Sequence, residues 1–150
     1  MADLRDLYQE VILDHSRRPQ NFRALEAPTA KSEGFNPVCG DRVTVYLDLV
    51  GDRIRDISFL GQGCSISKAS ASMMTGALKG KTKAEAQLLF DRFHEMVTRR
   101  PAGPYDAKML GKLAAFSGVS EFPTRVKCAS LPWHTLRAAL ESGVGTVSLE

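Results

Sequence analysis

Cysteine is scarce in this chain, and no two cysteines lie close together. Cys39, Cys64 and Cys128 are the three in 150 residues, with the spacing C-x24-C-x63-C. An odd number of widely spaced thiols does not fit a disulfide framework, and the paired C-x-x-C knuckles of structural zinc fingers are missing too. The sequence therefore points to thiols that bind a metal or carry out chemistry.

Other absences narrow the class of protein. No apolar run approaches the about 18 residues of a membrane span, so we expect no membrane partner. The start "MADLRDLYQEV" lacks the basic and apolar regions of a signal peptide, and we therefore expect a cytoplasmic protein. The net charge is only +3 and no nucleic-acid-binding motif is present, so we expect no nucleic-acid partner. No histidine is near a cysteine in the sequence, which disfavours a cysteine hydrolase.

The hydrophobic pattern predicts an α+β fold. Hydrophobic residues make up 43% and charged residues 25%, as in an ordinary globular domain, and we expect one domain over 1–150. Alternation over 43–49 and again over 53–60 predicts a β-hairpin with Gly51-Asp52 as its turn. Helical periodicity predicts helices over 4–15, 66–78, 82–97 and about 109–116.

The end of the chain is harder to assign. Pro132 inside a helix would cost about 3 kcal/mol, so we expect the last helix to begin near Ser130. The segment "SGVGTVSLE" over about 142–150 is expected to be a loose tail.

The register of the predicted hairpin also indicates which residues lie opposite the cysteines. Pairing across the two-residue turn places Asp48 opposite Arg55 and, farther along, Cys39 opposite Cys64. Asp41 is two residues from Cys39 and should project from the same face of the strand. The sequence "GQG" at 61–63 is where a bulge would shift this register.

Two further features suggest a metal site. Cys64 begins a predicted helix, where backbone N–H groups favour a thiolate, and Cys128 precedes the last helix. Three thiolates and one carboxylate, from Cys39, Asp41, Cys64 and Cys128, suit a tetrahedral zinc ion. The simpler alternatives are inert buried cysteines and an aspartate that caps a turn.

Four segments resemble the SufU/IscU family of iron–sulfur cluster assembly proteins, which also includes the NifU-like N-terminal domains. They are "LYQEVILDHSRRPQNF", "NPVCGDRV", "GQGCSISKASASMM" and "RVKCASLPW", and the similarity covers about residues 4–140. The resemblance implies a small antiparallel sheet of about three strands, with about five helices packed mainly on one face. Two details favour the SufU branch: Lys127 stands where IscU-type scaffolds carry a histidine, and 93–111 fits the SufU insertion.

The resemblance also implies a function. It implies Zn²⁺ bound by Cys39, Asp41, Cys64 and Cys128, with Cys39 as the acceptor of persulfide sulfur from a SufS-type cysteine desulfurase. The chain would then be a sulfurtransferase that works with this desulfurase and passes sulfur to downstream iron–sulfur assembly proteins. Arg125 and Lys127, close in sequence to Cys128, are candidates to offset the negative charge of the ligands.

Two alternatives remain open. One is an IscU-type scaffold that builds a [2Fe–2S] cluster on the same thiolates. The other is a purely structural zinc domain, although a chain of this length can bury a sufficient core without a metal.

Overall fold

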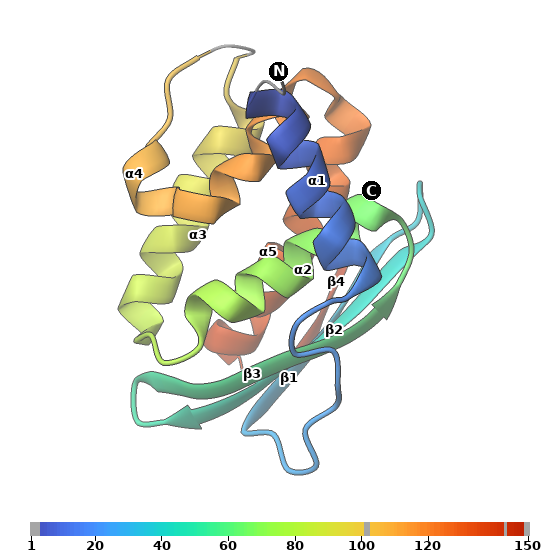
Figure 1. The fold of residues 1–150 in the computed structure, drawn as a ribbon. Coiled ribbons are helices and arrows are strands. Elements are labelled where there is room, and N and C mark those ends of the chain that lie inside the picture. Colours follow the sequence, from blue (N-terminus) through green and yellow to red (C-terminus); the bar gives the residue numbers. More distant parts are fainter. Residues whose placement is uncertain (1–3, 101–102, 143, 149–150) are drawn as a thin grey trace.

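The computed structural model describes residues 4–100, 103–142 and 144–148. Helices gather on one face of a twisted sheet (Figure 1), as the resemblance implied. The elements in chain order are α1 Leu4–Arg17, β1 Ala30–Asn36, β2 Asp41–Val50, β3 Arg53–Gln62, α2 Ser65–Leu78, α3 Lys83–Thr98, α4 Ala107–Leu110, the 3-10 helix η1 Gly111–Glu121, α5 Pro123–Ser142 and β4 Val144–Ser148.

The predicted three-stranded antiparallel sheet is confirmed, and a fourth strand extends it. The strand order is β3-β2-β1-β4, with β1, β2 and β3 antiparallel and β4 parallel to β1. The prediction of a loose tail over about 142–150 is therefore wrong for Val144–Ser148, while residues 143, 149 and 150 lie outside the described residues. The free edge of β1 presents unpaired N–H and C=O groups to which another strand can hydrogen-bond. Short local sequence patterns do not reveal that residues 144–148 pair there.

The β2–β3 register differs from the predicted one. Val50 pairs with Arg53, which confirms the two-residue turn, but an irregularity between Asp48 and Leu49 places Asp48 opposite Asp56. The predicted ion pair nevertheless forms, because the Arg55 guanidinium reaches Asp48 Oδ2 at 2.6 Å. The ladder ends at the pair Arg42–Gln62, so the predicted direct pairing of Cys39 with Cys64 does not occur.

The last helix begins earlier than the sequence predicts. α5 starts at Pro123 and runs through Pro132, instead of beginning near Ser130. A proline is well tolerated at the first position of a helix, which accounts for Pro123. Pro132 is retained inside the helix because this part of α5 is buried on both sides of it, with Leu131 at 0% and Trp133 at 1% exposure. Tertiary packing here outweighs the local cost of the proline.

The sheet and helices enclose one core, and α5 packs closely on the sheet. A Cβ at Gly34 in β1 would overlap Thr135 Oγ1 of α5, so glycine permits this approach. The largest fully buried side chains include Trp133, Phe59, Phe93 and Phe116. This close packing holds α5, and with it Cys128, against the sheet.

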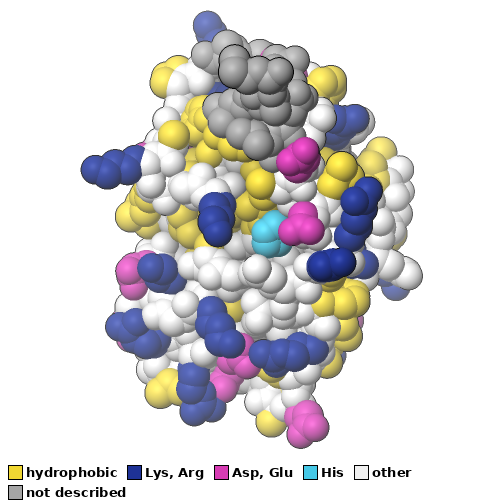
Figure 2. All heavy atoms as spheres, in the orientation of Figure 1, with side chains coloured by type: hydrophobic (Ala, Val, Ile, Leu, Met, Phe, Trp, Pro, Cys, Tyr) yellow, Lys and Arg dark blue, Asp and Glu magenta, His cyan; other side chains and the backbone are white. Residues whose placement is uncertain are grey.

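The surface is mixed in charge. On the face seen in Figure 2, lysine and arginine side chains are interspersed with acidic and apolar ones. None of the helices in the described part of the chain has the length and apolar character needed to cross a bilayer.

Candidate metal centre

The four predicted ligands come from four elements, and the structure brings three of them into one group. Cys39 lies in the turn between β1 and β2, Asp41 begins β2, Cys64 is the N-cap of α2, and Cys128 lies in α5. Ligand atoms of Cys39, Asp41 and Cys128 all lie within 4.8 Å of one another. Cys64 lies beside this group, with its Sγ 3.7 Å from Asp41 Oδ2, but its sulfur is not within 4.8 Å of all three ligand atoms.

The turn that carries Cys39 is shaped by Asn36. The Asn36 side-chain oxygen accepts a hydrogen bond from the N–H of Val38 at 3.2 Å, and its carbonyl accepts one from Gly40 at 2.8 Å. Gly40 has a φ of 73°, a conformation that favours glycine. These contacts fix the backbone on both sides of Cys39 while its side chain stays exposed. Cys39 is therefore the accessible member of the cluster.

Asp41 is fully buried and holds the cluster from the sheet side. One carboxylate oxygen, Oδ1, accepts a hydrogen bond from the N–H of Cys64 at 2.7 Å, and the other faces the Cys64 sulfur. Gly63, with φ of 141°, lies against this carboxylate, and a Cβ there would overlap Asp41 Oδ1. The glycine after β3 thus makes room for the aspartate at the start of β2.

The protonation of the thiols follows from these contacts. A hydrogen bond with Cys128 and the N–H groups of Ser67 and Ile66 lower the pKa of Cys64 to about 7, against burial and the Asp41 charge. The same hydrogen bond with Cys64, together with burial and the contacts with Asp41 and Cys39, raises the pKa of Cys128. Without a metal, the Cys64 thiol therefore loses its proton more readily than the Cys128 thiol.

The donor set fits a zinc ion. Two thiolate sulfurs bound at about 2.3 Å to a tetrahedral zinc are about 3.8 Å apart. The sulfurs of Cys39 and Cys128 lie 3.6 Å apart, and the Cys64 sulfur lies 3.7 Å from Asp41 Oδ2. Three sulfurs and one carboxylate oxygen are also donors that zinc accepts. Cys39, Asp41 and Cys128 therefore need little rearrangement to hold such an ion, and the Cys64 sulfur has to come closer to the rest of the group to complete the set.

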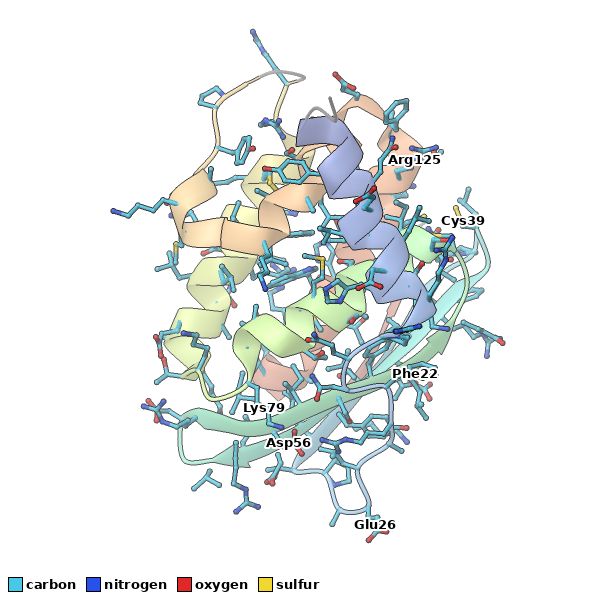
Figure 3. All side chains as sticks on the ribbon, in the orientation of Figure 1. Phe22, Glu26, Cys39, Asp56, Lys79 and Arg125 are labelled. Carbon is cyan, nitrogen blue, oxygen red and sulfur yellow. The ribbon has the colours of Figure 1, made fainter. Side chains whose placement is uncertain are left out.

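Arg125 lies apart from the four ligands. Its guanidinium stacks over the Phe122 ring at 4.8 Å from the centroid. Figure 3 shows Arg125 and Cys39 toward the same end of the molecule, away from Glu26. Among the described residues, no recorded hydrogen bond or ion pair joins Arg125 to a ligand, and its predicted role in offsetting charge stays a prediction.

A groove of about 630 Å³ lies next to the metal centre. It lies between α1, η1 and the start of α5, and its lining includes Ser65 and Ile66, which directly follow Cys64. Arg125 and Phe122 line it as well. The groove gives the cluster an open neighbouring surface.

Two positioning residues were not singled out from the sequence. Asn36 belongs to the quoted motif "NPVCGDRV", and an asparagine before a glycine-containing turn is a usable signal. In the sequence, Gly63 stands out only as part of the "GQG" pattern that suggests a bulge. Its contact with Asp41 depends on how two strand ends meet, which no local pattern reveals.

Comparison with known proteins places the chain in a family. The model of the NifU-like N terminal domain matches residues 7–129. The chain is 44% identical over 144 residues to the zinc-dependent sulfurtransferase SufU of Bacillus subtilis, covering 95% of this chain and 92% of that protein. It is 42% identical over 143 residues to the iron–sulfur cluster assembly scaffold protein IscU of Streptococcus pyogenes, covering 94% and 87%.

Solved structures agree with the sequence comparison. An iron–sulfur cluster assembly scaffold protein of the SUF system from Fervidobacterium islandicum superposes with a TM-score of 0.83 at 37% identity, covering 93% of this chain and all of that one. A NifU-like protein from Brucella abortus has a TM-score of 0.77 at 24% identity, covering 87% and 90%, and shares the fold. This chain therefore belongs to the NifU-like N-terminal domain family, which includes the IscU and SufU proteins of iron–sulfur cluster assembly.

Proposed function

We propose that this protein accepts persulfide sulfur on Cys39 and delivers it for iron–sulfur cluster assembly. The observation that carries the proposal is the difference in exposure among the thiols. Cys39 is exposed on a turn, Cys64 is half-buried at a helix end, and Cys128 is buried in α5. A sulfur that must meet a donor on another protein has to be the accessible one.

The transfer needs a thiolate and a donor persulfide. The Cys39 thiolate attacks the outer sulfur of the donor, a new S–S bond forms, and the donor's S–S bond breaks. Cys39 then carries the persulfide, and the donor cysteine leaves as a thiolate. No net oxidation or reduction takes place, so no further reactant is required.

The remaining ligands support this role. A bound zinc ion keeps the thiols deprotonated near neutral pH. Because Asp41, Cys64 and Cys128 lie on or at the ends of regular elements, they hold their places when Cys39 turns outward to react. A zinc bound by three thiolates and one carboxylate leaves a net charge of about −2. We propose that Arg125 and Lys127 offset this charge from outside the ligand shell.

The proposal includes a partner and a compartment. The donor is a SufS-type cysteine desulfurase, and the sulfur passes to downstream iron–sulfur assembly proteins. The relative named zinc-dependent sulfurtransferase SufU, at 44% identity, supports this choice. The reducing cytoplasm suits three free thiols and is the location we propose.

The test is a sulfur-transfer assay with Cys39→Ser. We expect this variant to accept no sulfur from the desulfurase, while the two proteins still associate in a pull-down. Thr44→Ser, a mild change on the neighbouring strand, should transfer normally. Wild-type transfer by Cys39→Ser would refute the assignment of the acceptor.

A scaffold for a [2Fe–2S] cluster is the second candidate, because the chain is nearly as similar to a protein named IscU. The same thiolates could bind such a cluster. Colour and metal analysis separate the two candidates. The zinc protein is colourless, whereas purified protein with a brown colour and stoichiometric iron would favour the scaffold.

A further inference from the structure

A single buried hydroxyl joins the two helices that carry Cys64 and Cys128. Ser70, in α2, donates a hydrogen bond to the carbonyl of Ala129 in α5 at 2.6 Å. It accepts another from the indole N–H of Trp133 at 3.2 Å. Ser70 and Ala129 are fully buried and Trp133 is 1% exposed, so water does not compete for these bonds. The connection spans the turn of α5 that follows Cys128.

This turn of α5 lacks one of its own backbone bonds. In a regular helix the carbonyl of Cys128 would accept a hydrogen bond from the N–H of residue 132. Residue 132 is a proline, which has no N–H and whose ring crowds that carbonyl. The position of Cys128 therefore depends more than usual on contacts from outside α5.

The hydroxyl of Ser70 lies where it can supply such a contact. Ala129 is next to Cys128, and Ser70 follows Cys64 by six positions, about 9 Å along the helix axis. The two bonds of Ser70 reach Ala129 and Trp133, which lie about one turn apart in α5. Two bonds to successive turns restrict both the rotation and the sliding of one helix against the other.

We infer that Ser70 is a positioning residue of the metal centre, which holds the proline-interrupted turn so that the Cys128 sulfur stays in reach of the other ligands. The inference rests on the zinc site of the proposed function. According to this inference, the hydrogen bonds of the Ser70 hydroxyl matter for zinc binding, and the size of the side chain does not.

The same helix offers a matched control. Ser72 is also fully buried and also uses its hydroxyl between elements, but it faces the other way. It bonds to His15 Nδ1 at 2.8 Å and to the N–H of Gln20 at 2.7 Å, in and just after α1. Loss of the Ser72 hydroxyl removes buried hydrogen bonds of α2 without touching α5.

The experiment measures zinc affinity by competition with a chelator, using Zn²⁺ alone and the full chain. We expect Ser70→Ala to weaken zinc binding by about tenfold or more. Ser72→Ala should stay within about twofold of the wild type, although both variants lower the melting temperature of the metal-free protein. Equal zinc affinities of the two variants would overturn the inference. A wild-type protein that binds no zinc would contradict the proposed metal site itself, and the inference with it.

A second arm uses Pro132→Ala, which restores a backbone donor to the Cys128 carbonyl and favours the helix. In this background the effect of Ser70→Ala on zinc affinity should shrink to about threefold or less. If Ser70→Ala lowers zinc affinity as much in Pro132→Ala protein as in the wild type, the role of the proline-interrupted turn is overturned. Because Pro132→Ala adds stability, this comparison stays measurable if Ser70→Ala alone folds poorly.

Discussion

The sulfur atoms of Cys39 and Cys128 lie 3.6 Å apart, although the two residues are 89 positions apart in the chain. One is exposed on the β1–β2 turn, and the other is buried in α5. The candidate metal centre thus has a buried inner part and one accessible thiol, and this difference can be measured.

The two cysteines should contribute unequally to metal binding. In Cys39→Ser, water can take the place of the exposed thiolate, so zinc affinity should fall moderately. In Cys128→Ser, the lost sulfur is buried and no water can replace it easily, so we expect a loss at least about tenfold larger. Chelator competition measures both. Equal losses would contradict the division into a buried part and an accessible thiol.

Gly63→Ala should disturb the centre through Asp41. The added Cβ overlaps Asp41 Oδ1, so the carboxylate or the end of β3 has to move. We expect zinc affinity to fall by about tenfold or more. Gly51→Ala is the control, because it also has a positive φ, of 62°, but its Cβ would meet open space. Gly51→Ala should bind zinc like the wild type. Equal zinc affinities of the two variants would contradict the role of the contact between residue 63 and Asp41.

Stability should fall in mild acid because of His134. Burial, followed by the charges of Arg137 and His94, lowers the pKa of His134 from 6.5 to about 4. Between these values the unfolded chain binds a proton that the folded protein does not, so stability is present above pH 6.5 and is lost toward pH 4. The half-buried ring should contribute about 1–3 kcal/mol.

The measurement is urea unfolding of the metal-free protein at several pH values. Removing the metal separates this effect from protonation of the ligands. In His134→Gln the slope of the unfolding free energy against pH should be smaller over this range. An unchanged slope would show that other groups cause the acid sensitivity.

Arg99 should stabilise the segment between α3 and η1. Its guanidinium donates to the carbonyls of Met96, Gly103 and Ser117 and stacks on the Tyr105 ring at 4.5 Å from the centroid. Arg99→Ala leaves three carbonyls without this donor and should cost about 1–3 kcal/mol of unfolding free energy.

Arg92→Ala provides the comparison for Arg99. Arg92 lies on the same helix, α3, and within the described ranges its ion pair is with the exposed Glu95 three residues on. Its loss should cost less than about 0.5 kcal/mol. Similar melting temperatures for the two variants would contradict the anchoring role of Arg99.

Much of the fold follows from local patterns. The helix predicted over 82–97 forms as α3, and a capping box begins it, with the Thr82 side chain accepting from Glu85 N at 3.1 Å. The Gly51-Asp52 turn also forms, because two-residue turns depend on the residues that occupy them. The four candidate ligands follow from the donor chemistry and from the motif resemblance, and the structure brings Cys39, Asp41 and Cys128 into one group with Cys64 beside it.

The errors arose where distant residues decide the outcome. The bulge occurs near Asp48 rather than at 61–63, β4 pairs with the edge of β1, and α5 runs through Pro132. In each case, packing or edge pairing with another element outweighed the local preference.

The sequence by itself determined the periodicity of most elements, which depends on residues close in the chain, and the residue types of the candidate ligands, which its short motifs display. Only the tertiary structure decided that Cys128 meets Cys39, that Asp41 is buried while Cys39 is exposed, and that Ser70 reaches α5. The physical reason is that these relations are set by how helices pack on the sheet, and that packing depends on the whole buried core.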